Sequence, residues 1–373
     1  MKLIKIIDAN GFETSPEKLT EHLTAVLQHI RKNKLFSNLS NDSNFPIIID
    51  DEDEDLESFN GSRAGKMEIS YKDKRRISDR AIKLSKARLA AAGLAHLKSE
   101  ERDRLQPALR GMQIVMPKGQ DWADEIAAQL HEEMPWMQRA TEYIWHALRR
   151  SAQRGEPITL RPVILNGPPG IGKSVWARSL AEALTLPFVD VDASKGGAGM
   201  ALVGVERGWG TALPGRPIDL LLSKRVANPL IVVDEICKAR TITSTRGARH
   251  AFADALLSLL EPATALKWEC QFFRLRFDMS HISWVLTSND IENVPEPVRS
   301  RCQVIEIPDV TVEHLHWFAR SKGAKLGLSV DSIEAIVMAI TQAPVVTKRR
   351  QSLRDVMRLL DRAEVLEGRP KRH

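Results

Sequence analysis

The chain has 373 residues, of which 43% are hydrophobic and 27% charged, a composition typical of a globular protein with two or three domains. Its net charge of +6 is too diluted to indicate a nucleic-acid-binding protein by itself. The cysteines, at positions 237, 270 and 302, are too far apart for a disulfide scaffold or a cysteine-rich zinc module, and they suit a reducing compartment. No apolar run approaches the roughly 18 residues of a membrane span. We therefore expect a cytoplasmic protein without a membrane partner.

The first third of the chain differs in composition from the rest. Apolar residues at helical spacing predict a helix over residues 16–33, within a small N-terminal helical segment at residues 1–36. Residues 37–65 follow, and seven of the eight residues from Asp50 to Glu57 are acidic. Because such a run repels itself, we expect an acidic, disordered linker rather than a metal site.

Residues 66–133 form a predicted basic helical region. Residues 66–110 contain 13 Lys and Arg but only 6 Asp and Glu, most of them on a predicted helical stretch from residue 79 to about 109. This pattern fits a solvated helix face, and it also fits a surface for nucleic acid or for an acidic partner. The acidic run could also pair with the basic one. The sequence leaves these alternatives open.

Five short apolar runs alternate with helical patterns in residues 134–308, which predicts a parallel, doubly wound α/β core. The expected strands are residues 163–165, 188–191, 230–233, 282–286 and 304–307. Helices are expected at residues 121–131 and 135–153. After residue 308 the pattern turns helical, with expected helices at 312–321, 331–340 and 352–367, in a C-terminal region of residues 309–373.

The first predicted strand of this core runs into the phosphate-binding pattern G-x-x-x-x-G-K-S, from Gly167 to Ser174. Glycines let backbone N–H groups close around phosphate oxygens, and the following helix start adds partial positive charge. Lys173 is expected to reach the β- and γ-phosphates of ATP, and Ser174 to ligate Mg²⁺. The expected ATP contacts of this loop are Gly167, Pro168, Pro169, Gly170, Ile171, Gly172, Lys173, Ser174 and Val175.

Polar residues end two further strands. Asp234 is expected to hold Mg²⁺ through water, and Glu235 to polarise the attacking water, since ligands of open α/β sheets bind at the carboxyl ends of the strands. Asn289, after the strand at 282–286, is expected to help to hold that water. Arg299 and Arg301 come just before the last strand, where they either serve the γ-phosphate of a neighbouring subunit or form surface salt bridges.

These motifs resemble those of AAA+ ATPases, and more closely the ATPase module of Lon proteases, over residues 134–366. The most specific segment is Val205–Arg216, and Asn228-Pro229 and Ala255–Pro262 also look like Lon. The resemblance implies a five-stranded AAA+ core with a C-terminal helical lid. It places Trp209 in a pore loop that grips polypeptide and makes Arg301 the arginine finger, although Ser300-Arg301-Cys302 also resembles the finger motif of DNA clamp loaders.

In the same resemblance, the predicted helix at 352–367 corresponds to the lid helix that carries the sensor 2 arginine. Arg354 is the first choice for this arginine, which would contact nucleotide from the lid. Arg350 is the alternative, because the register of Lon's own lid motif against this helix is uncertain.

The resemblance implies an ATPase that binds MgATP, assembles as a ring, expected to be a hexamer, and remodels or threads a polypeptide client. The chain ends soon after the predicted lid, so we expect no peptidase activity. Two other functions remain open: a nucleic-acid-associated, clamp-loader-like ATPase that uses the basic region, and an ATP-driven regulatory switch within a multi-protein system.

Overall fold

The computed structural model describes residues 2–9, 15–41, 69–208, 210, 212–239, 241–243, 249–347 and 350–368. The acidic run from Asp50 to Glu57 lies outside these residues. The chain divides into two compact units, one of residues 9–103 and one that combines residues 1–8 with 104–373. No helix in the described ranges is long and apolar enough to cross a membrane.

The smaller unit is built from two long helices, α1 (Pro16–Asn41) and α3 (Tyr71–Ala91), which pack against each other. α1 begins at the predicted residue but runs eight residues beyond the predicted end at 33. The side chain of Ser70 caps α3 by accepting a hydrogen bond from the backbone N–H of Lys72. An ion pair of 2.7 Å between Arg31 and Asp73 links the two helices.

The prediction of one continuous basic helix from residue 79 to 109 was wrong. α3 ends at Ala91, and a second helix, α4 (Ser99–Leu109), begins after seven intervening residues. Gly93 has a φ of +71°, and the N–H groups of Leu94 and Gly93 donate to the carbonyls of Leu89 and Ala90. This is a Schellman cap, in which a left-handed glycine ends the helix and turns the chain away.

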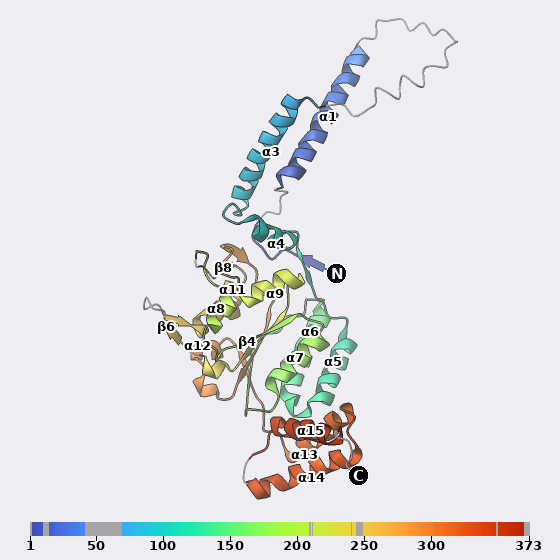
Figure 1. The fold of residues 1–373 in the computed structure, drawn as a ribbon, viewed down its shortest axis with the longest axis vertical. Coiled ribbons are helices and arrows are strands. Elements are labelled where there is room, and N and C mark those ends of the chain that lie inside the picture. Colours follow the sequence, from blue (N-terminus) through green and yellow to red (C-terminus); the bar gives the residue numbers. More distant parts are fainter. Residues whose placement is uncertain are drawn as a thin grey trace, which may run out of the picture. The chain divides into compact units, whose positions relative to one another are not determined.

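The larger unit is organised around a sheet of five parallel strands in the order β11–β3–β10–β5–β4 (Figure 1). The strands are β3 (Val163–Asn166), β4 (Phe188–Asp192), β5 (Leu230–Asp234), β10 (Ser283–Ser288) and β11 (Gln303–Glu306). This confirms the predicted five-stranded parallel core. All residues of β3 and β10 are buried, which is why both contain an apolar run, at residues 163–165 and 284–286.

Helices cover this sheet, and three two-stranded ribbons accompany it (Figure 1). The longer helices are α5 (Gln120–Glu133), α6 (Gln138–Arg154), α7 (Lys173–Ala183), α9 (Arg216–Lys224) and α10 (Phe252–Leu260). The short ones are η1 (Pro135–Met137), α8 (Ala198–Val203), η2 (Ile236–Lys238), α11 (Pro262–Ala265), η3 (Ile291–Asn293) and α12 (Glu296–Arg299). The ribbons pair β1 (Lys2–Ile4) with β2 (Met112–Ile114), β6 (Thr241–Thr243) with β7 (Arg249–Ala251), and β8 (Trp268–Cys270) with β9 (Leu275–Phe277).

A buried asparagine fixes the chain that leads into the sheet. Asn228 is fully buried, and its amide donates to the carbonyls of Val115 and Ile158 at 3.0 and 2.8 Å. Its side-chain oxygen accepts the N–H of Val115 at 2.9 Å. These bonds satisfy the polar groups of a segment that would otherwise be buried without partners.

The C-terminal helices α13 (Val312–Lys325), α14 (Val330–Thr347) and α15 (Leu353–Glu367) pack on one another and form the predicted helical lid. α15 touches the glycine loop directly, because the N–H of Leu353 donates to the carbonyl of Gly170 at 3.2 Å. A β-carbon on Gly170 would come within 2.9 Å of Ser352, so the loop and the lid meet without room for a side chain.

Candidate functional site

The glycine loop between β3 and α7 borders a cavity of about 910 Å³ that residues of the lid also line. Gly170 and Gly172 have φ values of +80° and +88°, which only glycine adopts at little cost. Six of the nine predicted loop contacts line the cavity: Pro169, Gly170, Gly172, Lys173, Ser174 and Val175. The other three contribute differently: Gly167 and Pro168 offer their carbonyls to Lys173, and Ile171 is buried in the core.

Lys173 is a buried cation, with 6% of its surface exposed. Its ammonium donates to the carbonyls of Gly167 and Pro168 at 2.6 and 2.8 Å, and to Oδ1 of Asn289 at 2.8 Å. All three acceptors are neutral. Burial lowers the pKa of Lys173 to about 8, although the nearby Asp234 carboxylate opposes the shift. A buried charge without a bonded counterion is costly, so this ammonium is prepared for an anionic ligand.

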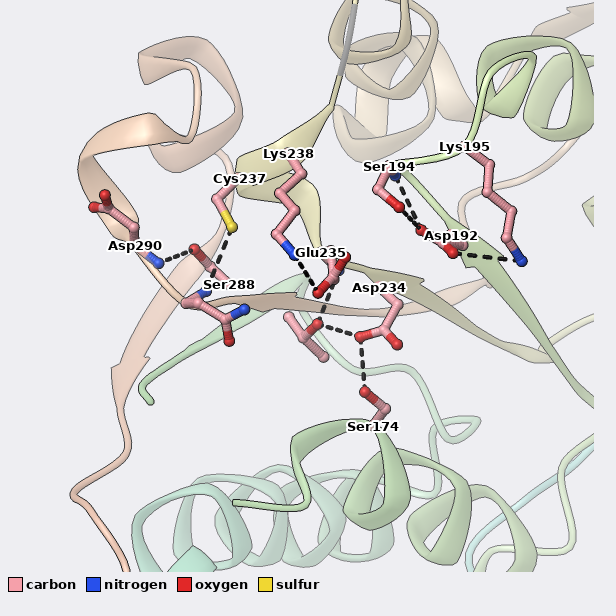
Figure 2. A network of polar contacts seen from close by, with 12 residues as sticks. Ser174, Asp192, Ser194, Lys195, Asp234, Glu235, Cys237, Lys238, Ser288 and Asp290 are labelled. Atoms are coloured by element: carbon pink, nitrogen blue, oxygen red, sulfur yellow. Dashed lines mark hydrogen bonds and ion pairs between the residues drawn. The ribbon is translucent and has the colours of Figure 1, made fainter. Parts of the chain in front are cut away.

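Asp234 joins Ser174 to the rest of the polar network in Figure 2. The Ser174 hydroxyl donates to Oδ1 of Asp234 at 2.7 Å. The hydroxyl of Thr287, a residue that the sequence did not single out, donates to the same carboxylate oxygen and accepts the backbone N–H of Glu235 at 3.1 Å. A hydroxyl beside a carboxylate is the oxygen ligand set that Mg²⁺ prefers.

Glu235 follows β5 in an unusual backbone conformation, with a φ of +56°. Its Oε1 accepts a 2.7 Å bond from the ammonium of Lys238, three residues later on the η2 turn (Figure 2). This bond raises the pKa of Lys238. Sequence reasoning missed Lys238, although the spacing of three residues after the acid was a usable signal. The predicted water-polarising carboxylate is therefore engaged by a cation of its own chain.

Aromatic side chains line the lid side of the cavity, and sequence reasoning missed them. Trp136, Trp317 and Phe318 all border it. The indole N–H of Trp136 donates to the carbonyl of Ile171 in the glycine loop at 2.8 Å, and its ring meets those of Trp317 and Phe318 edge-on at 6.2 and 6.1 Å. Trp136 is buried and supports the half-buried rings of Trp317 and Phe318, which are suited to hold the flat base of a nucleotide.

The arginines named from the sequence lie in different places. Arg354 lines the cavity, whereas Arg350 pairs with Asp309 at the surface. Arg301 does not line the cavity of its own chain; it pairs with Glu261 at 3.0 Å and donates to the carbonyl of Pro297 at 2.9 Å. Arg299 makes a looser pair of 3.7 Å with Glu292. The structure thus brings Lys173, Asp234, Glu235 and Asn289 together with Arg354, and it leaves Arg301 outside.

Trp209 lies outside the described residues, so the structure does not test its predicted role. The segment around it has a narrow base, because Gly204 and Pro214 form a bridge and Val205 N–H donates to the carbonyl of Leu213 at 2.9 Å. A β-carbon on Gly215 would come within 2.2 Å of the carbonyl of Leu202. Glycine is therefore required where the two ends of this segment meet.

Comparisons with known proteins agree with this geometry. Residues 163–309 match the family described as ATPase family associated with various cellular activities (AAA). The chain is 33% identical over 156 residues to a Lon protease of Clostridium acetobutylicum, which covers 42% of this chain and 19% of that protein. It is 34% identical over 177 residues to a Lon protease of Heliobacterium modesticaldum, and the match covers 47% of this chain and 20% of that protein.

The similarity extends to eukaryotes, since a mitochondrial Lon protease homolog of Candida dubliniensis is 31% identical over 211 residues, covering 54% of this chain and 19% of that protein. The chain thus spans about a fifth of the length of the curated relatives it matches. The matched residues contain the glycine loop, Asp234, Glu235 and Asn289 that gather at the cavity. Residues 163–309 are therefore an AAA ATPase domain, similar to part of the Lon proteases.

Proposed function

We propose that this chain is a Lon-like AAA+ ATPase that works as a ring and uses ATP hydrolysis to remodel or thread polypeptides. The observation that carries the ATPase assignment is the buried ammonium of Lys173, which has only neutral acceptors and faces the same cavity as Asp234 and Glu235. In this proposal the β- and γ-phosphates become the missing anionic partner of Lys173, and Trp317 and Phe318, supported by Trp136, receive the base.

Hydrolysis needs positioning and neutralisation of charge more than covalent chemistry. Ser174 and Asp234 would hold Mg²⁺, Asp234 through water, and the ion would supply charge neutralisation at the phosphates. Asn289, fixed against Lys173 at 2.8 Å, is placed to orient a water near the γ-phosphate. Glu235 would polarise that water once its carboxylate leaves Lys238. Arg354 would add positive charge from the lid.

The ring is proposed from Arg301. An arginine finger serves a γ-phosphate from a neighbouring subunit, and Arg301 is held away from its own cavity by Glu261. The polypeptide client is proposed from the similarity to proteins named Lon protease and from Trp209, which stands between two glycines in a segment on a narrow base. A large aromatic side chain can press on an extended polypeptide without reading its sequence.

The test is ATPase activity with and without casein, an unfolded polypeptide. We expect ATP hydrolysis that casein stimulates, and loss of both rates in Lys173→Ala but not in the control Lys195→Ala. Hydrolysis by Lys173→Ala at the wild-type rate would contradict the phosphate assignment. Wild-type ATPase that no unfolded polypeptide stimulates would retain the ATPase but favour a regulatory switch over a threading motor.

A second pair of variants tests the pore loop. Trp209→Ala is expected to keep basal ATPase and to lose stimulation by casein, because the aromatic surface that presses on the client is gone. Trp209→Tyr should keep much of the stimulation, because a flat ring remains. Loss of basal ATPase in Trp209→Ala would instead assign this residue to the folded core.

A further inference from the structure

One side of α3 carries a row of cations. At 3.6 residues per turn, these side chains fall within roughly 80° of a line opposite the buried face of the helix. They are Lys72, Arg75, Arg76, Arg80, Lys83 and Lys86, and all six are exposed. The buried residues Ile77, Ala81 and Ser85 occupy the other side. We call the six cations the basic stripe.

The basic stripe is not neutralised within the described part of the chain. None of its six side chains has an ion pair there. Asp73, an acid on the same helix, forms its ion pair with Arg31 of α1 instead, at 2.7 Å. Asp79 is the single acid that lies within the stripe. Maintaining six like charges in a row costs free energy by self-repulsion, and an anionic ligand would recover that cost.

Geometry and composition together identify the ligand. From Lys72 to Lys86 the stripe extends about 21 Å at 1.5 Å per residue, the length over which one strand of a duplex presents about six phosphates. Its centre holds no aromatic or large apolar anchor of the kind that dominates protein interfaces. The exposed apolar residues of α3, Tyr71 and Ile82, lie on its flank, away from the centre of the stripe. This helix also lacks the free apolar face that would insert into a membrane, because that face packs on α1.

We propose that the basic stripe of α3 binds the phosphate backbone of duplex nucleic acid, without base-specific readout. Arginine at three of the six positions fits this ligand, since its guanidinium bonds phosphate oxygens in pairs. The surface belongs to the smaller unit and not to the ATPase site, so it would give the ATPase a place to anchor on nucleic acid rather than a second catalytic centre.

The experiment measures binding of the full chain to a fluorescent 25-base-pair duplex DNA of mixed sequence by anisotropy, from 50 to 200 mM KCl. With about four phosphate contacts, affinity should fall about 100-fold over this range. The triple variant Arg75→Glu, Arg76→Glu, Arg80→Glu should bind at least about 100-fold more weakly at 50 mM KCl and lose about 3 from the salt slope. Its basal ATPase should equal that of the wild type.

Two control variants separate this surface from net charge and from folding. Lys224→Glu, Lys267→Glu, Arg276→Glu makes the same charge change on exposed residues of the larger unit and should bind nearly as the wild type does. Arg75→Lys, Arg76→Lys, Arg80→Lys keeps the charge and should bind within a few-fold. If the stripe variant binds as tightly as the control with equal charge, the proposal is overturned.

Three further arms test other ligands. Poly-glutamate that binds with the affinity and salt slope of DNA would overturn the nucleic-acid assignment in favour of an acidic polypeptide. A second variant carries Asn and Gln in place of the acids of residues 50–57. If this variant binds the duplex tightly and the wild type does not, the chain's own acidic run occupies the basic stripe. Duplex RNA in parallel distinguishes the two nucleic acids, and tight binding of either one supports the proposal.

Discussion

The two units of this chain use positive charge in opposite ways. In the larger unit two cations of the site have defined partners: Lys173 is buried and bonded to three oxygens, and Lys238 holds Glu235. On α3 six cations stand exposed in a row, and none has an ion pair in the described ranges. The fixed cations of the ATPase domain suit one small anion held in a defined geometry. The row of exposed cations on α3 suits an extended anion that carries many charges. The effect of losing one cation should therefore be large in the domain and small on the helix.

The largest expected effect concerns Arg301, which lies outside the cavity of its own chain. Arg301→Ala should lower ATP turnover by roughly 10³-fold, as for loss of an arginine finger, and should leave ATP binding nearly unchanged. Arg299→Ala, the neighbouring arginine, should lower it far less. Steady-state hydrolysis and nucleotide binding measure the two effects. Because the residue would act in trans, rings mixed from Arg301→Ala and Lys173→Ala subunits should recover activity, and no recovery after verified subunit exchange would contradict that.

Glu235→Gln should have the next largest effect. The change keeps the size of the side chain and leaves Asp234 in place, but it removes the carboxylate that polarises water, so turnover should fall roughly 100-fold or more. ATP should still bind, and the assembled oligomer should persist. Glu182→Gln, an exposed acid on α7, is the matched control and should hydrolyse ATP normally. A Glu235→Gln protein that neither binds nucleotide nor assembles would assign this residue a structural role.

The buried position of Lys173 predicts opposite pH effects on ATP binding and on stability. Its pKa in the folded apo protein is about 8, below the ordinary value of 10.5. Only the protonated form attracts phosphate, so the dissociation constant for ATP should rise about tenfold per pH unit above pH 8. Between pH 8 and 10.5 the unfolded chain binds more protons than the folded one, so this residue makes the apo protein more stable as pH rises.

Titration of ATP binding and of thermal unfolding from pH 7 to 10 measures both effects. Lys173→Arg stays charged throughout this range and is the control for binding. Lys173→Met carries no titratable group and is the control for stability. The difference between the wild type and each control isolates the contribution of Lys173. ATP affinity that falls equally in wild type and Lys173→Arg would contradict the assignment.

Local patterns in the sequence predicted most of the fold, and the reason is physical. The central strands β3, β5 and β10 are buried on both faces, so each one contains an apolar run. The glycine loop is contiguous in sequence and carries its own conformational requirements. The break between α3 and α4 was missed because a single left-handed glycine, Gly93, ends the helix within a stretch of good helix formers. Thr287 and the aromatic wall were missed because their roles arise only from contacts between segments far apart in the chain.

The smallest expected effect concerns Lys238. Its substitution tests whether this cation only adjusts the rate of hydrolysis or is needed to form the site. The bond from Lys238 to Glu235 is partly exposed to solvent, so breaking it costs little free energy. If Glu235 must leave this bond to polarise water, that small cost is part of the activation barrier. Lys238→Met should then raise turnover modestly, by no more than a few-fold, with unchanged ATP affinity. Added salt should raise wild-type turnover toward that of the variant, because screening weakens the pair.

Lys195→Met is the control. It removes a comparable exposed cation, paired with Asp192 at 3.4 Å, and should leave turnover unchanged. A fall in turnover in Lys238→Met would mean that the pair holds Glu235 in its working position instead of a resting one.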